Sequence, residues 1–229
     1  MPLTRRQFNR ALLAALAAGP CSSAHAVKTP PAKAATNKAP ALDLVEGRDW
    51  APITPAQPGD SAGKIEVLEF FSYGCPHCRD FHPLVTRWAA KLPKDIAFRR
   101  VPVTFGRAAW SNLARLFYSL EATGQLDRLD QGAFDAIHGK HANLFTETAI
   151  LDWVTAQGVK STTFRAAFRS FAVETRLARA EQLARVYKVE GVPLLTVGGR
   201  YAVLGKAAKG LPDLLTIADA LIVKAHGRS

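Results

Sequence analysis

Hydrophobic and polar positions alternate in blocks along the chain, and the first clear block predicts a strand–helix–strand unit. Residues 65–71 are apolar at almost every position, which is typical of a strand near the centre of a sheet. From Phe81 to Leu92 the apolar residues recur at helical spacing, and we expect Pro83 to kink this helix without ending it. Residues 96–103 predict the second strand of the unit.

The next part of the chain shows helical patterns and none that is typical of a strand. Between residues 105 and 172, apolar residues recur at helical spacing in several short stretches, which Gly124, Gly139 and Gly158 separate. Residues 173–188 predict a longer amphipathic helix with arginines on its outer face. We interpret residues 105–172 as a helical block inserted between these elements.

The end of the chain predicts a hairpin followed by a helix. Two short apolar runs, residues 194–197 and 201–204, are joined by Gly198 and Gly199, and strands joined by two glycines form tight hairpins. Residues 211–223 then predict the last helix. Without the helical block, the order is strand, helix, strand, hairpin and helix, which is an α/β arrangement.

The first 26 residues have the three-part order of an export signal. A basic start is followed by the small apolar residues 11–19 and an Ala-X-Ala cleavage site, with Arg5, Arg6, Arg10, Ala24 and Ala26 as the key residues. We therefore predict a signal peptide over residues 1–26 and an exported protein. Residues 4–8 are also similar to a twin-arginine signal, so export by the Sec or the Tat route stays open. Residues 27–47 are rich in Ala, Pro, Lys and Thr and predict a flexible lead-in.

Composition excludes several classes of protein. The chain has 229 residues, of which 48% are hydrophobic and 9% aromatic, so it is too apolar for a disordered chain. Three cysteines are too few for a small disulfide-stapled scaffold. The net charge of +11 comes from scattered basic residues with acids among them, so we expect a solvated basic surface and no nucleic-acid partner. By default we expect a monomer.

Two of the cysteines form the motif Cys75-Pro76-His77-Cys78 between the first strand and its helix. A disulfide that closes so short a loop adds little stability, so chemistry explains the pair better. The helix N-terminus favours the thiolate of Cys75, Pro76 suits the first helical turn, and His77 adds a positive charge or a donor. We therefore expect Cys75 to be the nucleophile and Cys78 the resolving thiol, with this disulfide as the only redox group and no separate cofactor.

Other readings of the motif have less support. Half of a zinc site needs a second pair of ligands, and His82, His138 and His141 show no ligand spacing, so no metal site is predicted. Haem attachment needs a histidine directly after the second cysteine, where Arg79 stands. An inert structural disulfide remains as a further alternative. We expect His138 and His141 to lie at the surface, and Trp88, Trp110 and Trp153 to lie in the core.

The segment LEFFSYGCPHC, residues 68–78, resembles the active-site segment of the DsbA family of periplasmic thiol:disulfide oxidoreductases. Gly191-Val192-Pro193 resembles the cis-proline loop of that family, and the resemblance covers residues from about 48 to 226. It implies a thioredoxin fold, residues 48–104 and 173–229, with an inserted helical domain, residues 105–172. It also implies that the protein donates disulfides to newly exported proteins with free thiols, and that a DsbB-like inner-membrane partner linked to quinones reoxidises it.

The resemblance also assigns roles to single residues. Cys75 and Cys78 correspond to the nucleophile and its partner, Pro76 and His77 to the dipeptide that sets the redox potential, and Val192 and Pro193 to the pair that holds a substrate strand. Glu69 matches a buried acid of the family, and Arg99 is the candidate for the basic partner of that acid.

Two other functions compete with a disulfide oxidase. A disulfide isomerase or a reductant can use the same fold, although isomerases of this type usually carry a sizeable N-terminal dimerisation domain. A reductant more often has Gly-Pro between its cysteines than the Pro76-His77 of this chain. A metal-binding or chaperone-like module that captures unfolded exported chains is the alternative from another class.

Overall fold

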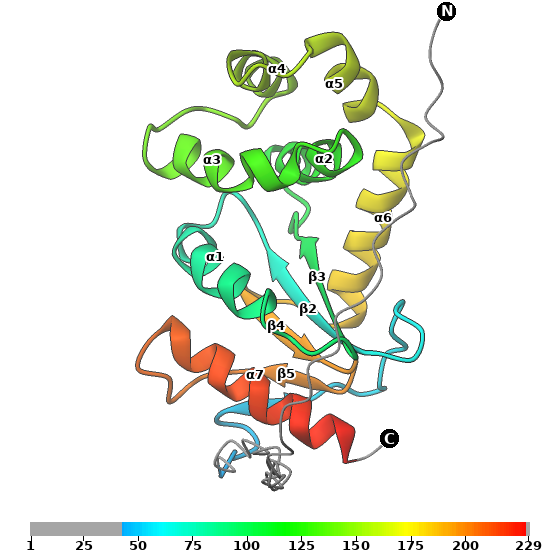
Figure 1. Cartoon of the computed structure of the whole chain (residues 1–229), viewed down its shortest axis with the longest axis vertical. Coiled ribbons are helices and arrows are strands. Elements are labelled where there is room, and N and C mark those ends of the chain that lie inside the picture. Colours follow the sequence, from blue (N-terminus) through cyan, green and yellow to red (C-terminus); the bar gives the residue numbers. More distant parts are fainter. Residues whose placement is uncertain (1–42, 228–229) are drawn as a thin grey trace, which may run out of the picture. The chain divides into compact units, whose positions relative to one another are not determined.

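The fold is built on a five-stranded sheet with the strand order β1–β5–β4–β2–β3 (Figure 1). The computed structural model describes residues 43–227, so the predicted signal peptide and residues 27–42 of the lead-in lie outside the described residues. The strands are β1 (Trp50–Pro52), β2 (Ile65–Phe71), β3 (Ile96–Pro102), β4 (Leu194–Val197) and β5 (Tyr201–Val203). Strands β2 and β3 are parallel, and the other neighbouring pairs are antiparallel.

The strand pattern read from the sequence is confirmed for four of the five strands. Strand β2 lies between β4 and β3, and its residues from Glu66 to Phe71 are all buried, as its nearly continuous apolar run predicts. Strand β1 was not predicted; it is only three residues long and pairs with β5 at the edge of the sheet. So short a strand leaves too few residues for an alternating pattern to be recognised.

Helices cover both faces of the sheet. Helix α1 (Pro76–Ala89) and helix α7 (Leu211–His226) share one hydrophobic cluster with Val67 of β2. On the other face, Phe70 contacts Tyr187 just after helix α6 (Phe171–Val186), with 5.3 Å between the ring centroids. Helix α1 continues through Pro83, so the expectation that this proline does not end the helix is confirmed. None of the helices within residues 43–227 combines the length and hydrophobicity that crossing a membrane requires.

The predicted helical block contains four helices and no strand within residues 105–172. They are α2 (Ala108–Ala122), α3 (Leu126–His138), α4 (Glu147–Ala156) and α5 (Ser161–Phe168), and Figure 1 shows them gathered at one end of the sheet. Phe71 at the end of β2 packs against Phe117 and Phe134, with centroid distances of 5.1 and 6.3 Å. The block and the sheet therefore share one hydrophobic cluster, and the domain boundaries at residues 48, 105 and 173 stay predictions.

The hairpin between β4 and β5 turns at the two glycines, as predicted. Gly198 and Gly199 have φ angles of +59° and +63°, and Arg200 N–H donates to the carbonyl oxygen of Val197. Two central residues with positive φ define the turn whose twist matches paired strands. A Cβ atom at Gly199 would overlap the carbonyl oxygen of Gln57, so this position also needs glycine for space.

The three tryptophans expected in the core are only partly buried. Each packs against a hydrophobic cluster but keeps part of its surface exposed; they are Trp88, Trp110 and Trp153. The indole Nε1 of Trp88 donates to Asp219 Oδ1 at 2.7 Å. Tryptophan often behaves in this way because its ring carries a polar N–H that needs a partner.

Candidate active site

Cys75 lies at the point where the sheet passes into helix α1. It is the N-cap residue of α1, with extended backbone angles (φ −98°, ψ 119°), and Pro76 is the first helical residue. The turn before it is held by Ser72, whose carbonyl oxygen accepts from Cys75 N–H and whose hydroxyl accepts from Gly74 N–H, both at 3.1 Å. Cys75 therefore stands in front of the unpaired N–H groups of the first helical turn.

The two thiols of the motif differ strongly in environment. They are not bonded to each other, so the structure shows the dithiol form. Hydrogen bonds from the Cys78 thiol and from the backbone N–H groups of Cys78 and His77, with the charge of His77, lower the pKa of Cys75 from its ordinary 9.0 to about 6. Burial and the neighbouring Cys75 raise the pKa of Cys78, which is completely buried. Cys75 is the sulfur that ionises first.

The loop of Val192 and Pro193 approaches Cys75 from the far part of the chain. The peptide bond between Val192 and Pro193 is cis, and the Cys75 thiol donates a hydrogen bond to Val192 O at 3.3 Å. The fold thus brings together Cys75, Cys78, Val192 and Pro193, as the resemblance implies. Pro76 and His77 are exposed in the first turn of α1, where a partner could reach them.

Glu69 is buried, but its basic partner is Arg100 and not Arg99 as expected. Arg100 Nε donates to Glu69 Oε2 at 2.9 Å, whereas Arg99 pairs with Asp60 and Glu66. The register of the sheet explains the difference, because Glu69 of β2 is directly opposite Arg100 of β3. Successive side chains of a strand point to opposite faces, so Arg99 meets the acids on the other side of the sheet.

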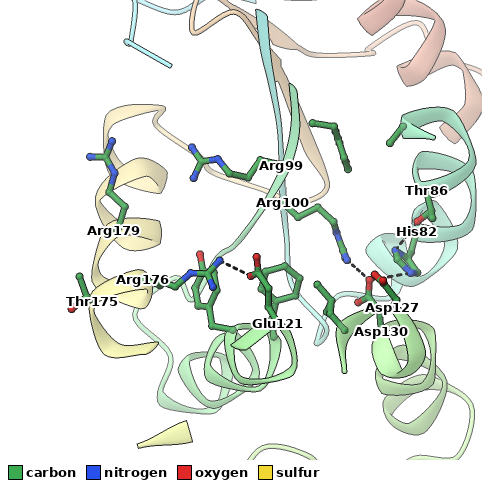
Figure 2. A pocket seen from close by; sticks show the side chains of 15 residues that line it. His82, Thr86, Arg99, Arg100, Glu121, Asp127, Asp130, Thr175, Arg176 and Arg179 are labelled. Atoms are coloured by element: carbon green, nitrogen blue, oxygen red, sulfur yellow. Dashed lines mark hydrogen bonds and ion pairs between the residues drawn. The ribbon is translucent and has the colours of Figure 1, made fainter. Parts of the chain in front are cut away.

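Arg100 belongs to a largely buried group of polar residues that we call the charge cluster: Glu69, Tyr73, His82, Arg100 and Asp130. Asp130 is its centre, because it accepts from Arg100 Nη1 at 2.5 Å and from the Tyr73 hydroxyl at 2.6 Å. His82 Nε2 lies 3.4 Å from the same carboxylate (Figure 2). Asp130 lies on α3 and is bonded to Arg100 of β3 and to Tyr73 of the turn that leads to Cys75. The charge cluster therefore joins the helical block to the sheet next to this cysteine turn, residues 72–78.

Burial is the largest cause of the pKa shifts of Glu69 and His82 in the charge cluster. It raises the pKa of Glu69, and the Arg100 charge opposes that rise. It lowers the pKa of His82 to about 4, with a further contribution from the positive charge of Arg100, so His82 is neutral at physiological pH. The cluster borders a cavity of about 620 Å³ whose lining also includes the Arg176–Glu121 ion pair (Figure 2).

His138 is not the surface residue that the sequence analysis expected. It is half-buried at the end of α3, and its Nε2 lies 2.7 Å from the carbonyl oxygen of Tyr73. His141 is exposed, as predicted. Sequence reasoning missed the roles of Tyr73, Asp130 and His138 because their contacts cross 57 and 65 residues of chain. Within residues 43–227, no group of three or more potential metal ligands converges.

The sheet order, the Cys-X-X-Cys motif at the start of α1 and the cis-proline loop beside it define a protein of the thioredoxin class. A family model for the DSBA-like thioredoxin domain matches residues 66–221, and the chain belongs to this family. The predicted fold class, an α/β thioredoxin fold with an inserted helical domain, is therefore confirmed.

Named relatives and solved structures agree with this assignment. The chain is 39% identical over 194 residues to "Thiol:disulfide interchange protein DsbA" of Bordetella parapertussis, covering 84% of this chain and 92% of the relative. Identity to the protein of the same name in Pseudomonas aeruginosa is 37% over 186 residues, covering 81% and 88%. The crystal structure of Pseudomonas aeruginosa DsbA superimposes with a TM-score of 0.77 and 35% identity over 81% of this chain and 96% of that one. The DsbA structure from Xylella fastidiosa gives 0.74 and 32%, over 80% and 98%.

Proposed function

We propose that this protein is a thiol:disulfide oxidase that donates its Cys75–Cys78 disulfide to newly exported proteins. The observation that carries the proposal is the asymmetry of the two thiols, since the pKa of Cys75 is lowered to about 6 while that of Cys78 is raised. A thiol that is ionised at neutral pH stabilises the reduced form of the protein. A protein whose reduced form is stabilised is an oxidant of other thiols.

The reaction consists of two thiol–disulfide exchanges. A substrate thiolate attacks Cys75 Sγ and forms a mixed disulfide, while the Cys75–Cys78 bond breaks and Cys78 leaves as a thiolate that takes up a proton. A second substrate thiolate then attacks the substrate sulfur of this mixed disulfide and releases Cys75 as a thiolate. The substrate gains a disulfide and loses two electrons, which the Cys75–Cys78 pair receives. The low pKa of Cys75 makes it a good leaving group in the second step.

The cis-proline loop supplies the surface on which a substrate segment can lie. Val192 and Pro193 are half-buried beside Cys75, and a cavity of about 590 Å³ opens next to them. An extended peptide with its cysteine at Cys75 would run along this loop and place neighbouring side chains in the cavity. Main-chain recognition of this kind is independent of most side chains, which suits an enzyme that acts on many unfolded proteins.

The protein would act in the periplasm and be reoxidised from the inner membrane. The signal peptide predicted over residues 1–26 would send the protein to the periplasm. There a DsbB-like inner-membrane protein would accept the two electrons and restore the Cys75–Cys78 disulfide. The relatives are named thiol:disulfide interchange proteins, which supports the reaction class.

The decisive measurement is the reduction potential of the mature protein in defined glutathione buffers. Reference values are about −120 mV for DsbA, the family of this chain, and about −270 mV for thioredoxin; neither comes from this structure. We expect a value near the first. A value near the second would identify a reductant and contradict the proposal. Equimolar zinc or copper in the protein purified at neutral pH would instead support the metal-binding alternative.

A further inference from the structure

One residue of the cysteine turn, Tyr73, is held along its whole length by a single helix. Its hydroxyl donates to Asp130 Oδ1 at 2.6 Å, and its ring packs edge-on against Phe134 with centroids 4.8 Å apart. Its carbonyl oxygen lies 2.7 Å from His138 Nε2. Asp130, Phe134 and His138 are spaced four residues apart on α3, so they form one stripe on the helix.

The two hydrogen bonds between Tyr73 and α3, to Asp130 and to His138, differ in their surroundings. Asp130 is already committed to the charge cluster, because it also accepts from Arg100 Nη1. At the other end, His138 has the Tyr73 carbonyl as its hydrogen-bond partner and stacks on Phe134, with 6.5 Å between the ring centroids. A carbonyl oxygen can only accept, so Nε2 of His138 carries the hydrogen in this contact. His138 thus fixes the orientation of the Tyr73–Gly74 peptide.

That peptide lies directly before the nucleophile. The thiolate of Cys75 is favoured by hydrogen bonds from Cys78 and from the N–H groups of His77 and Cys78. Such bonds depend steeply on angle, so their strength follows from the direction in which the turn delivers Cys75 to the start of α1. On the other side, Trp110 packs so closely against the turn that a Cβ atom at Gly74 would lie 3.0 Å from Trp110 Nε1. The turn is therefore confined on that side as well.

We propose that His138 is a positioning residue, which acts through the Tyr73 carbonyl to aim Cys75 at the donors of the first helical turn. The helical block thereby sets the reactivity of a cysteine that lies outside it, at the start of α1. This inference rests on the proposed function only in taking Cys75 as the reactive thiol. It makes His138 neither a base nor a substrate contact.

The test compares His138→Leu, which removes the donor, with His138→Gln, whose amide N–H₂ can replace it. Gln131→Leu is the matched control, because it is the same change from polar to apolar on the exposed side of α3. The thiolate absorbance of the reduced protein is followed against pH, and the equilibrium with glutathione is measured at pH 8. Near-ultraviolet circular dichroism and urea unfolding report on folding.

We expect His138→Leu to raise the thiolate midpoint by about half a pH unit to one unit, since one hydrogen bond of ordinary strength is lost. The equilibrium constant for reduction by glutathione then falls about three- to tenfold at pH 8. His138→Gln and Gln131→Leu should stay within about twofold of the parent.

Two outcomes would overturn the proposal. If His138→Leu lowers the urea midpoint but leaves the thiolate midpoint unchanged, His138 is only structural. If His138→Gln loses as much as His138→Leu, the donated hydrogen bond is not the cause. A parent protein without a titration near pH 6 would instead contradict the proposed function, so the two failures are distinguishable.

Discussion

The turn of residues 72–78 and the charge cluster below it both hold charge away from bulk water, by different means. In the turn, one sulfur ionises with a lowered pKa because backbone and thiol donors face it. In the charge cluster, two carboxylates share one guanidinium, with Arg100 bonded to both Glu69 and Asp130. Tyr73 belongs to both regions.

The two regions use different partners because the charge on Cys75 is transient and the charges of the cluster are permanent. The charge on Cys75 appears and disappears in each reaction cycle, so a permanent counter-charge beside it would be left unpaired in the oxidised protein. Fixed dipoles at the start of a helix carry no such penalty, because they also stay partly solvated when the charge is absent. The charges in the cluster are permanent, so opposite charges can pair them. Hydrogen-bond donors and dipoles, with a smaller contribution from the exposed His77, therefore stabilise the reactive group, and ion pairs stabilise the scaffold.

The largest expected effect concerns the two sulfurs. Cys75→Ser should abolish thiol oxidation, because the Cys75–Cys78 disulfide that a substrate thiolate attacks can no longer form. Cys78→Ser should instead trap mixed disulfides, since the Cys75 thiolate can still attack a substrate disulfide but the thiol that would displace the substrate again is gone. Non-reducing gels of the periplasmic fraction measure both. Absence of adducts with Cys78→Ser would show that Cys75 is not the attacked sulfur.

The next effect tests the permanent charges. Arg100→Met should lower the free energy of unfolding by about 3–5 kcal/mol, because it leaves the buried carboxylate of Glu69 without its partner and takes one donor from Asp130. The control is Arg169→Met, whose side chain is 67% exposed and pairs with Glu147 at the surface, and a loss of about 1 kcal/mol or less is expected. Urea unfolding at pH 7 measures both losses. Equal losses would mean that the cluster is no more than a surface ion pair.

The transient charge has a characteristic pH dependence. The pKa of Cys75 is lower in the folded dithiol, about 6, than its ordinary 9.0. The stabilisation of the folded dithiol is therefore complete above the ordinary value and disappears as pH falls through about 6. Glutathione keeps its proton up to about pH 8.5. The equilibrium constant for reduction of the protein by glutathione should therefore rise about tenfold per pH unit from about pH 6 to about pH 8.5. Below pH 6 it should be flat, and a flat curve throughout would contradict the thiolate.

The smallest effect concerns the frame of the turn. Ser72→Ala removes the hydroxyl that accepts from Gly74 N–H, and we expect a loss of about 1 kcal/mol in the free energy of unfolding. The charge cluster should be unaffected. Ser111→Ala on α2, whose hydroxyl only donates to a carbonyl of its own helix, is the control and should change stability less. Thermal unfolding of the dithiol form measures the difference.

The sequence predicted the parts of the site that are local in the chain. The Cys75–Cys78 motif, the strand before it and the helix after it lie within one short segment, so periodicity and spacing are sufficient to find them. The pairing of Glu69 with Arg100 depends on the register of two parallel strands, and neighbouring Arg99 is equally basic. One residue of register decides between the two faces of a strand, and no local pattern contains that information.

The contacts of the helical block with Tyr73 could not be predicted either, because they too depend on how distant elements pack. Asp130 and His138 belong to an ordinary amphipathic helix pattern, and a histidine near a helix end is usually solvated. Only the packing of α3 against the turn gives them Tyr73 as a common partner. The helices themselves were predicted, because apolar spacing is a local property, but which face of which helix meets the sheet is not.

The tip of the hairpin has a practical consequence for work with this protein. The Gly198–Gly199 turn has the appearance of a free loop end, the usual place to insert a tag, a reporter or a second domain. Here the backbone of Gly199 accepts a hydrogen bond from Gln57 N–H, and a side chain at Gly199 would overlap Gln57. Insertion at this tip would separate strands β4 and β5, and the cis-proline loop leads directly into β4. A fusion partner should be placed elsewhere, because this turn is an interior contact between two backbones.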